Sequence, residues 1–166
     1  MARERDETGK IERAHQHQPV EPMSFAICNL VQDDYEQMEE MFYCVFPDVE
    51  TGLKDAFKYR VKNLSKGIYL DSGELVGFIL CDIYGETFNA VKVNYIVVHP
   101  AYQKNGLGSM LLEHILRLSK RMAKNVILIP VQKRHILQWY RKKGFRISKV
   151  TDAQGGGKLY EMTYAV

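Results

Sequence analysis

Apolar residues recur every three to four positions in four stretches of the chain, a spacing typical of helices with one buried face. In the first stretch Asp33 or Asp34 can cap a helix that runs to about Phe46, and Pro47 ends it. The same spacing predicts three further helices, over residues 50–63, 108–122 and 133–143. The chain is therefore expected to contain about four helices.

Short runs of β-branched and apolar residues alternate with these stretches and predict strands. The runs cover residues 25–29, 67–70, 75–83, 91–98, 126–129, 145–150 and 159–164. Glycine-containing turns join the second run to the third and the sixth to the seventh, which predicts hairpins. Hairpins mixed with helical crossovers predict an α/β architecture with a central mixed, mostly antiparallel sheet of about six to seven strands.

Residues 1–22 are polar and show no sustained periodicity, so we expect a disordered tail there. Residues 23–166 are expected to form one domain, which is long enough to bury a core without disulfides or metal ions. The tail contains His15 and His17, but solvated tail histidines are far commoner than metal ligands. We therefore predict no metal.

The cysteines and the lack of long apolar runs indicate an intracellular setting. Cys28, Cys44 and Cys81 are odd in number and far apart, which is typical of reduced thiols. No apolar run approaches the length of a membrane span, and the N-terminus has no hydrophobic signal region. We expect a cytoplasmic protein, or a nuclear one in a eukaryote or virus, that is a monomer or a homodimer and does not contact a membrane.

Acidic and basic residues are segregated along the chain. Residues 31–55 contain eight acids and one base, whereas residues 99–149 contain twelve lysines or arginines and one acid. Opposite potentials favour a cationic ligand near the first region and an anionic ligand near the second. The alternative is that both are solvated helix faces without a ligand.

The loop after the strand at 91–98 has the chemistry of a phosphate site. It reads Gln103-Lys104-Asn105-Gly106-Leu107-Gly108 and leads into a helix. Glycine lets the backbone approach a ligand closely, and the first N–H groups of a helix have no internal partner. Lys104 adds a charge and Ser109 a hydroxyl, so the loop predicts a phosphate or pyrophosphate site, although such glycines also occur merely to form a turn.

Two nucleotide-binding motifs are excluded by the same loop. The dinucleotide fingerprint requires a glycine where Leu111 stands, and a P-loop requires Gly-Lys-Ser or Gly-Lys-Thr, which the chain lacks.

Two segments resemble the motifs of one family. Residues 93–116, with Ile96-Val97-Val98-His99-Pro100, the glycine loop and Met110-Leu111-Leu112, resemble the central motif of the GNAT superfamily of N-acetyltransferases. Trp139-Tyr140-Arg141-Lys142-Lys143-Gly144-Phe145 resembles its second motif, a helix that ends in Tyr-x-x-x-Gly-Phe. The order of predicted elements is similar to that of the family over residues 24–164.

This resemblance implies acetyl-coenzyme A as the acetyl donor. It implies that the pantetheine arm lies along the backbone of Ile96, Val97 and Val98, and that the thioester lies where the strand at 91–98 splays from the strand at 125–129. The pyrophosphate would be held by the amides of the glycine loop, from Gln103, Lys104 and Asn105 through Gly106, Leu107 and Gly108 to Ser109. The family often has arginine in place of Gln103 and asparagine in place of Lys133, so Lys133 is instead a candidate to reach a coenzyme A phosphate.

Tyr140 matches the family tyrosine that protonates the leaving thiolate, and the alternative is a core tyrosine. The general base that would take the proton of the amine is harder to identify from the sequence. Asp82 and Glu86 lie near the end of one strand and its turn and are the candidates, ahead of His99, His114 and His135. The residues expected on the acceptor side are Asp48, Glu50, Asn94 and Tyr95.

The resulting hypothesis is direct acetyl transfer from acetyl-coenzyme A to a primary amine. The acidic region favours a small cationic amine such as a polyamine, and a protein lysine or N-terminus is the alternative. Two hypotheses of other classes remain: a coenzyme A-binding protein without turnover, and a nucleic-acid-binding module that uses the basic half. The second is weaker because aromatic residues there are few.

Overall fold

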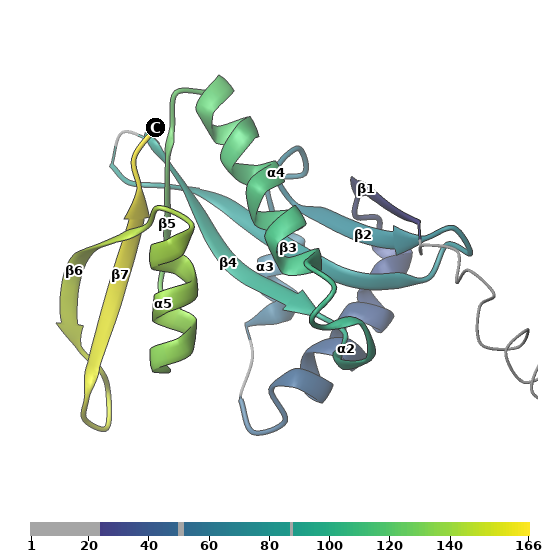
Figure 1. Ribbon diagram of the computed structural model, residues 1–166, viewed down its shortest axis with the longest axis horizontal. Helices are drawn as coiled ribbons and strands as arrows, with labels where there is room; N and C mark the ends of the chain where they lie inside the picture. The colour runs from purple at the N-terminus through teal and green to yellow at the C-terminus, as the bar shows by residue number, and fades with distance from the viewer. Residues whose placement is uncertain (1–23, 50–51, 87) are drawn as a thin grey trace, which may run out of the picture.

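A seven-stranded mixed sheet organises the chain in the computed structural model, which describes residues 24–49, 52–86 and 88–166 (Figure 1). The strand order is β1-β2-β3-β4-β5-β7-β6. The strands are β1 (Phe25–Asn29), β2 (Lys66–Leu70), β3 (Leu75–Tyr84), β4 (Ala90–Val98), β5 (Asn125–Leu128), β6 (Arg146–Asp152) and β7 (Lys158–Tyr164). The described strands pair antiparallel except β4 with β5, which pair in parallel. The predicted mixed, mostly antiparallel sheet is confirmed.

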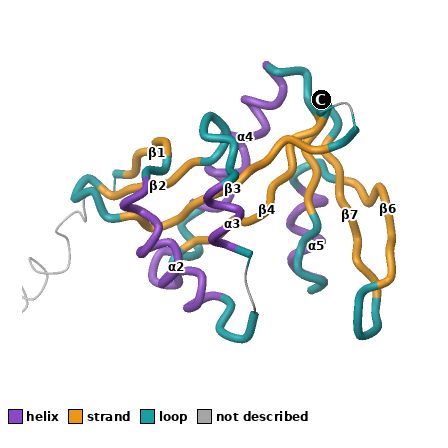
Figure 2. Tube along the Cα trace, turned by 180° about the vertical axis from the view of Figure 1, so that it is seen from behind, coloured by secondary structure: helices purple, strands orange, loops and turns teal. Residues whose placement is uncertain are grey.

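Four α-helices flank the sheet, as the sequence predicted. They are α2 (Tyr35–Val45), α3 (Leu53–Lys58), α4 (Leu107–Arg121) and α5 (Arg134–Lys142), and two short 3-10 helices, η1 (Gln32–Asp34) and η2 (Pro100–Tyr102), precede α2 and α4. Helix α4 lies on one face of the sheet, and α2 and α3 lie on the other, as the view from behind shows (Figure 2).

Strand β3 divides the core into two layers. It is buried from Leu75 to Cys81, and successive side chains of a strand point to opposite faces. Ile79 and Cys81 pack with Leu111 and other α4 residues, whereas Phe78 and Leu80 pack with α2 and α3. A fully apolar strand is therefore required here, because both faces are covered.

The start of α2 differs from the prediction that an aspartate caps it. Asp34 precedes α2, but its carboxylate does not bond the first turn of that helix. Asp34 is buried, and its Oδ2 accepts hydrogen bonds of 2.7 Å from the Val31 N–H and from the Tyr69 hydroxyl on β2. The carboxylate thus ties the approach to α2 to the sheet.

Helix α3 is much shorter than the predicted helix over 50–63. It ends at Lys58, and the Arg60 side chain donates to the Phe57 carbonyl over 2.7 Å. The Val61 N–H then donates to Cys81 O on β3. The helix therefore ends where the Arg60 side chain binds a carbonyl of its last turn and the next backbone donor, Val61 N–H, bonds to the sheet.

The Tyr69–Asp34 bond gives a stability prediction. Replacing Tyr69 with phenylalanine should lower the free energy of unfolding by about 1–2 kcal/mol, because a buried carboxylate loses one of its two donors. Urea unfolding monitored by fluorescence measures the change. Tyr59→Phe is the matched control, since Tyr59 is 66% exposed. Equal stability of both variants would contradict a structural role for the bond.

Two sequence expectations concern the membrane and the tail. None of the helices in the described ranges has the length and apolar character needed to cross a bilayer. The expected disordered tail, residues 1–22, lies outside the described residues.

Candidate active site

The site begins where β4 and β5 separate. The two strands pair from Ala90 with Asn125 to Val93 with Leu128, and β4 then continues to Val98 without β5 beside it (Figure 1). Leu80 of β3 pairs with Tyr95 and Cys81 with Val93, so Asn94 is an extra residue in a β-bulge. The strand therefore bends away at the point where its partner ends, as the resemblance implied.

A cavity of ≈ 460 Å³ occupies this gap. Its walls come from both separating strands and from α5 and the end of α2. Strand β4 contributes Val93, Asn94, Tyr95 and Ile96. The segment from β5 to α5 contributes Leu128, Ile129, Pro130 and Val131, and α5 contributes His135, Ile136, Trp139 and Tyr140. The cavity has the size and mostly apolar lining of a small-molecule site.

Tyr140 is the buried titratable group of this cavity. Its ring packs edge-on against Trp139 and Phe145, with centroid distances of 4.9 and 5.5 Å. Burial raises the pKa of Tyr140 to about 12, and no charge or hydrogen bond in the described part of the chain contributes to the shift. The hydroxyl is therefore protonated at neutral pH and has a proton to donate.

The other predicted residues on the acceptor side have different places. Asn94 and Tyr95 line the cavity, and the Tyr95 ring packs edge-on against Phe42 at 5.4 Å. Asp48 is exposed in the turn after α2 and does not line the cavity, although its neighbour Val49 does. Glu50 lies outside the described residues.

The two carboxylates predicted as the base are not brought to the cavity. Asp82 pairs with Lys92, toward the start of β4, and its Oδ1 accepts the Ile83 N–H over 2.7 Å. Glu86 is exposed in the turn beyond β3, still farther from Asn94. Both carboxylates lie near the turn between β3 and β4, which is at the start of β4. The cavity lies farther along β4, where that strand leaves β5, so the carboxylates do not reach it.

His135, which the sequence ranked behind Asp82 and Glu86, is a titratable residue that lines the cavity. It lies in the first turn of α5 and lines the cavity together with Tyr140. His99 instead accepts the Ala101 N–H through Nδ1, and His114 lies on α4.

Aromatic residues of α2 were missed altogether. Phe42 and Phe46 line the cavity and pack against each other at 5.2 Å. Phe42 lies on α2 and Phe46 directly follows its last residue, Val45, and nothing local distinguished either ring from the apolar residues of a buried helix face.

The loop before α4 has the geometry of an anion-binding turn. Lys104 and Gly106 adopt left-handed backbone angles, with φ of 68° and 75°. The Gln103 side chain donates to Val98 O over 3.1 Å, and the Asn105 side chain donates to Tyr102 O over 3.1 Å. These bonds fix the loop from within while its own backbone stays exposed.

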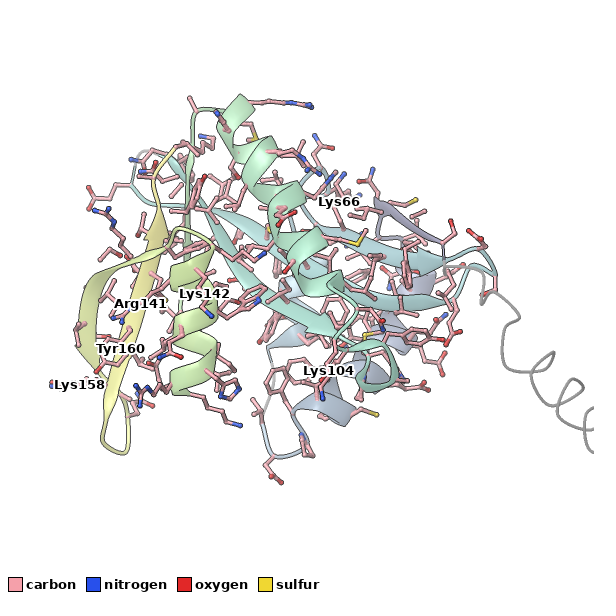
Figure 3. All side chains as sticks on the ribbon, in the orientation of Figure 1. Lys66, Lys104, Arg141, Lys142, Lys158 and Tyr160 are labelled. Carbon is pink, nitrogen blue, oxygen red and sulfur yellow. The ribbon has the colours of Figure 1, made fainter. Side chains whose placement is uncertain are left out.

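The start of α4 provides free donors beside this loop. The first hydrogen bond of the helix is from Met110 N–H to Gly106 O, so the N–H groups of Leu107, Gly108 and Ser109 have no intrahelical partner. No heavy atom lies within 4 Å of the place where a Cβ on Gly106 would stand. Leu107 is buried and anchors the turn, and Figure 3 shows Lys104 beside it. This open turn fits a pyrophosphate.

The remaining residues predicted for the donor lie in or near this path. Ile96 lines the cavity, Val98 is half-buried at the end of β4, and Val97 faces the α2 side of the core. Lys133 is exposed and directly precedes α5. Strand β4 thus connects the cavity to the glycine loop.

No group of three or more potential metal ligands occurs within the described ranges. The chemistry of the site is that of donors and apolar walls.

Known proteins share this architecture. A family model described as acetyltransferase (GNAT) domain matches residues 65–147. An uncharacterized N-acetyltransferase of Methanocaldococcus jannaschii is 20% identical over 142 residues, which cover 76% of this chain and 63% of that protein. A peptidyl-lysine N-acetyltransferase of Salmonella typhimurium is 30% identical over 92 residues, 55% of this chain and 57% of the relative. The chain thus spans less than two thirds of the length of these relatives.

A solved structure supports the same fold. The structure of Arabidopsis thaliana Naa50 in complex with the bisubstrate analogue CoA-Ac-MVNAL superposes with a TM-score of 0.70 at 19% identity, and the match covers 86% of this chain and 99% of that one. The family model covers half of the chain, including the glycine loop and Tyr140. The chain belongs to the GNAT family of acetyltransferases.

Proposed function

We propose that the protein transfers the acetyl group of acetyl-coenzyme A directly to a primary amine. The observation that carries the proposal is the protonated Tyr140 hydroxyl in the cavity where β4 and β5 separate. Strand β4 runs from this cavity to the open glycine loop. The loop and first turn of α4 would hold the pyrophosphate, and β4 would align the pantetheine arm toward the cavity.

The reaction needs one proton removed and one supplied. The neutral amine nitrogen bonds to the carbonyl carbon of the thioester, the carbon–sulfur bond breaks, and the Tyr140 hydroxyl gives its proton to the thiolate. The proton that the bonded nitrogen then releases returns to Tyr140 through water. Residues of β4 beyond Val93 line the cavity, and their backbone groups would orient the carbonyl.

His135 is the residue we propose to accept the proton of the incoming ammonium group. Among the described residues that line the cavity, the titratable ones are Tyr95, His135 and Tyr140. A neutral imidazole accepts a proton near pH 7, whereas a tyrosine whose pKa is about 12 does not.

Replacing His135 with glutamine should therefore lower kcat/KM about tenfold or more at pH 7. The deficit should shrink as the pH rises, because the free amine then loses its proton to water. Initial rates between pH 6 and about pH 9.5 measure this. His114→Gln, on α4 outside the cavity lining, is the control. A deficit that is constant with pH would assign His135 to binding.

The acceptor is best matched by an amine attached to an apolar group. Phe42, Phe46 and Val49 line the acceptor side, and none of the described lining residues is acidic. A peptide N-terminus with an apolar first side chain fits this lining. The polyamine hypothesis instead depends on exposed acids of α2 and on Asp48, next to the cavity mouth residue Val49.

Thiol release from acetyl-coenzyme A with a panel of amines tests both levels of the proposal. The panel contains a peptide with N-terminal methionine, an N-blocked lysine peptide, spermidine, putrescine and an arylamine. We expect the highest kcat/KM with the N-terminal methionine peptide. A preference for spermidine would support the acetyltransferase activity but contradict the proposed peptide acceptor. Coenzyme A binding without turnover of any amine would contradict the proposed enzymatic activity.

A further inference from the structure

A second cavity lies near η1 and α3, apart from the one that contains Tyr140. Its volume is ≈ 690 Å³, and it shares no lining residue with the first cavity. Its lining includes residues of α2 and α3, and Figure 2 shows these two helices on the face of the sheet opposite α4, the helix that follows the glycine loop. Sites for small organic molecules have volumes of about 300–1,000 Å³, so this cavity is large enough for one.

The lining of this cavity is strongly cationic. Lys54, Lys58, Arg60 and Lys62 contribute to it, and none of the described lining residues is acidic. Neither of the two salt bridges found in the described residues involves any of the four. Asp34, whose charge acts on Arg60, is buried and already accepts from Val31 and Tyr69. Four cations around one hollow favour an anion.

Arg60 is held in a fixed orientation with donors to spare. Its Nη1 donates to Phe57 O over 2.7 Å, and its Nη2 donates to Leu30 O over 3.3 Å. The guanidinium also lies over the Phe57 ring at 3.9 Å. A guanidinium has five N–H groups, so three remain, including a buried Nε–H that has no partner in the described structure. A rigid guanidinium with free donors on its Nη atoms suits an oxyanion.

The rest of the lining is aromatic and apolar. The rings of Tyr35 and Phe57 lie 5.3 Å apart at 42°, and Leu30 and Val31 complete the wall. The Tyr35 hydroxyl donates to Glu39 Oε2 over 3.0 Å, which fixes the ring. Leu30 and Phe57 are themselves buried, at 4% and 3% exposed, so the apolar surface that a ligand can reach belongs to Tyr35 and Val31. A hydrated inorganic ion would leave that surface exposed to water, whereas a planar apolar group would cover it.

We propose that this second cavity binds a small organic phosphate with an aromatic body, independently of acetyl-coenzyme A. The phosphate would lie among the three lysines and the Arg60 guanidinium, and the aromatic group would lie against Tyr35 and Val31. The inference depends on the second cavity alone and holds whether or not the protein transfers acetyl groups.

Calorimetric titration with phenyl phosphate tests the proposal on the full chain in saturating coenzyme A, which fills the donor site. Inorganic phosphate and phenol are titrated in parallel, because each carries one half of the recognised chemistry. We expect saturable binding of phenyl phosphate with a Kd below about 1 mM, at least about tenfold tighter than either fragment.

Two charge-matched variants locate the binding. Lys54→Gln/Lys58→Gln/Lys62→Gln removes three positive charges from the cavity, and Lys120→Gln/Lys142→Gln/Lys149→Gln removes three exposed charges elsewhere. The first should weaken phenyl phosphate about tenfold or more, and the second should leave it unchanged. Arg60→Lys keeps the charge but not the fork of donors, and should also weaken binding.

Three results would overturn the inference. They are no saturable binding, equal losses in both triple variants, and binding of inorganic phosphate as tight as that of phenyl phosphate.

Discussion

Replacing Tyr140 with phenylalanine is expected to lower kcat for acetyl transfer by about 10²- to 10⁴-fold and to leave the KM for acetyl-coenzyme A near its original value. The thiolate would leave without the proton that the hydroxyl supplies, whereas the ring would still pack against Trp139 and Phe145. Since the hydroxyl has no partner within the described residues, the variant should unfold at the same urea concentration or a higher one.

The pH dependence follows from the raised pKa of Tyr140. Its pKa of about 12, above the ordinary tyrosine value of 10.0, keeps the acid protonated throughout the neutral and mildly alkaline range. The rate should therefore not fall with rising pH below about pH 10 on account of this group. The stability gained from the neutral form is complete below pH 10 and is lost as the pH rises toward 12.

Tyr160→Phe is the matched control for Tyr140→Phe. Tyr160 lies on β7, where Figure 3 labels it, and it does not line the cavity. Both variants are compared by initial rates of thiol release and by urea unfolding. If Tyr140→Phe kept more than about a third of wild-type kcat while Tyr160→Phe did the same, the hydroxyl would not be the acid.

Replacing Gly106 with valine is the second change with a large expected effect. The residue has a φ of 75°, and a β-branched side chain in that region costs about 1–3 kcal/mol. The valine must either keep this strain or move the loop, and moving it would withdraw the backbone from the position proposed for the pyrophosphate. We expect the free energy of unfolding to fall by that amount and the Kd for coenzyme A to rise about tenfold or more.

Gly108→Ala separates loop geometry from the mere addition of a methyl group. Gly108 is in the first turn of α4, and an added Cβ would lie 3.9 Å from the Val98 Cγ2, an ordinary contact. This variant should gain up to about 1 kcal/mol of stability and should bind coenzyme A normally. Calorimetry and urea unfolding compare the two variants, and wild-type affinity in Gly106→Val would show that the loop does not hold the donor.

Much of the fold was predictable because, in long segments, the spacing of apolar residues alone indicates whether a helix or a strand forms. The sequence predicted a strand over 75–83 and a helix over 108–122, and the structure has β3 at Leu75–Tyr84 and α4 at Leu107–Arg121. The helix over 50–63 was wrong in extent because its end is decided by contacts with β3, such as Val61 N–H to Cys81 O. Such distant bonds leave no local pattern.

The parts of the candidate site that lie in contiguous motifs were predictable, whereas those contributed by distant segments were not. The glycine loop and Tyr140 lie in contiguous motifs, and the structure has an open turn at the first and a cavity at the second. Phe42 and His135 reach that cavity from helices far apart in the chain. The cationic cavity near α3 was missed because charge was counted over residues 31–55, and Lys58, Arg60 and Lys62 lie just beyond that window.

The parallel pairing of β4 with β5 has a consequence for the order of folding. Strands β1 to β4 are joined antiparallel by neighbours in the sheet, and β5, β7 and β6 form a second antiparallel group. The two groups meet along four residue pairs, Ala90–Val93 with Asn125–Leu128. Such a long-range parallel contact forms late, so amide hydrogens of β5 should exchange faster than those of β3. A ligand bound in the cavity between the two groups of strands would then slow amide hydrogen exchange first where β4 pairs with β5.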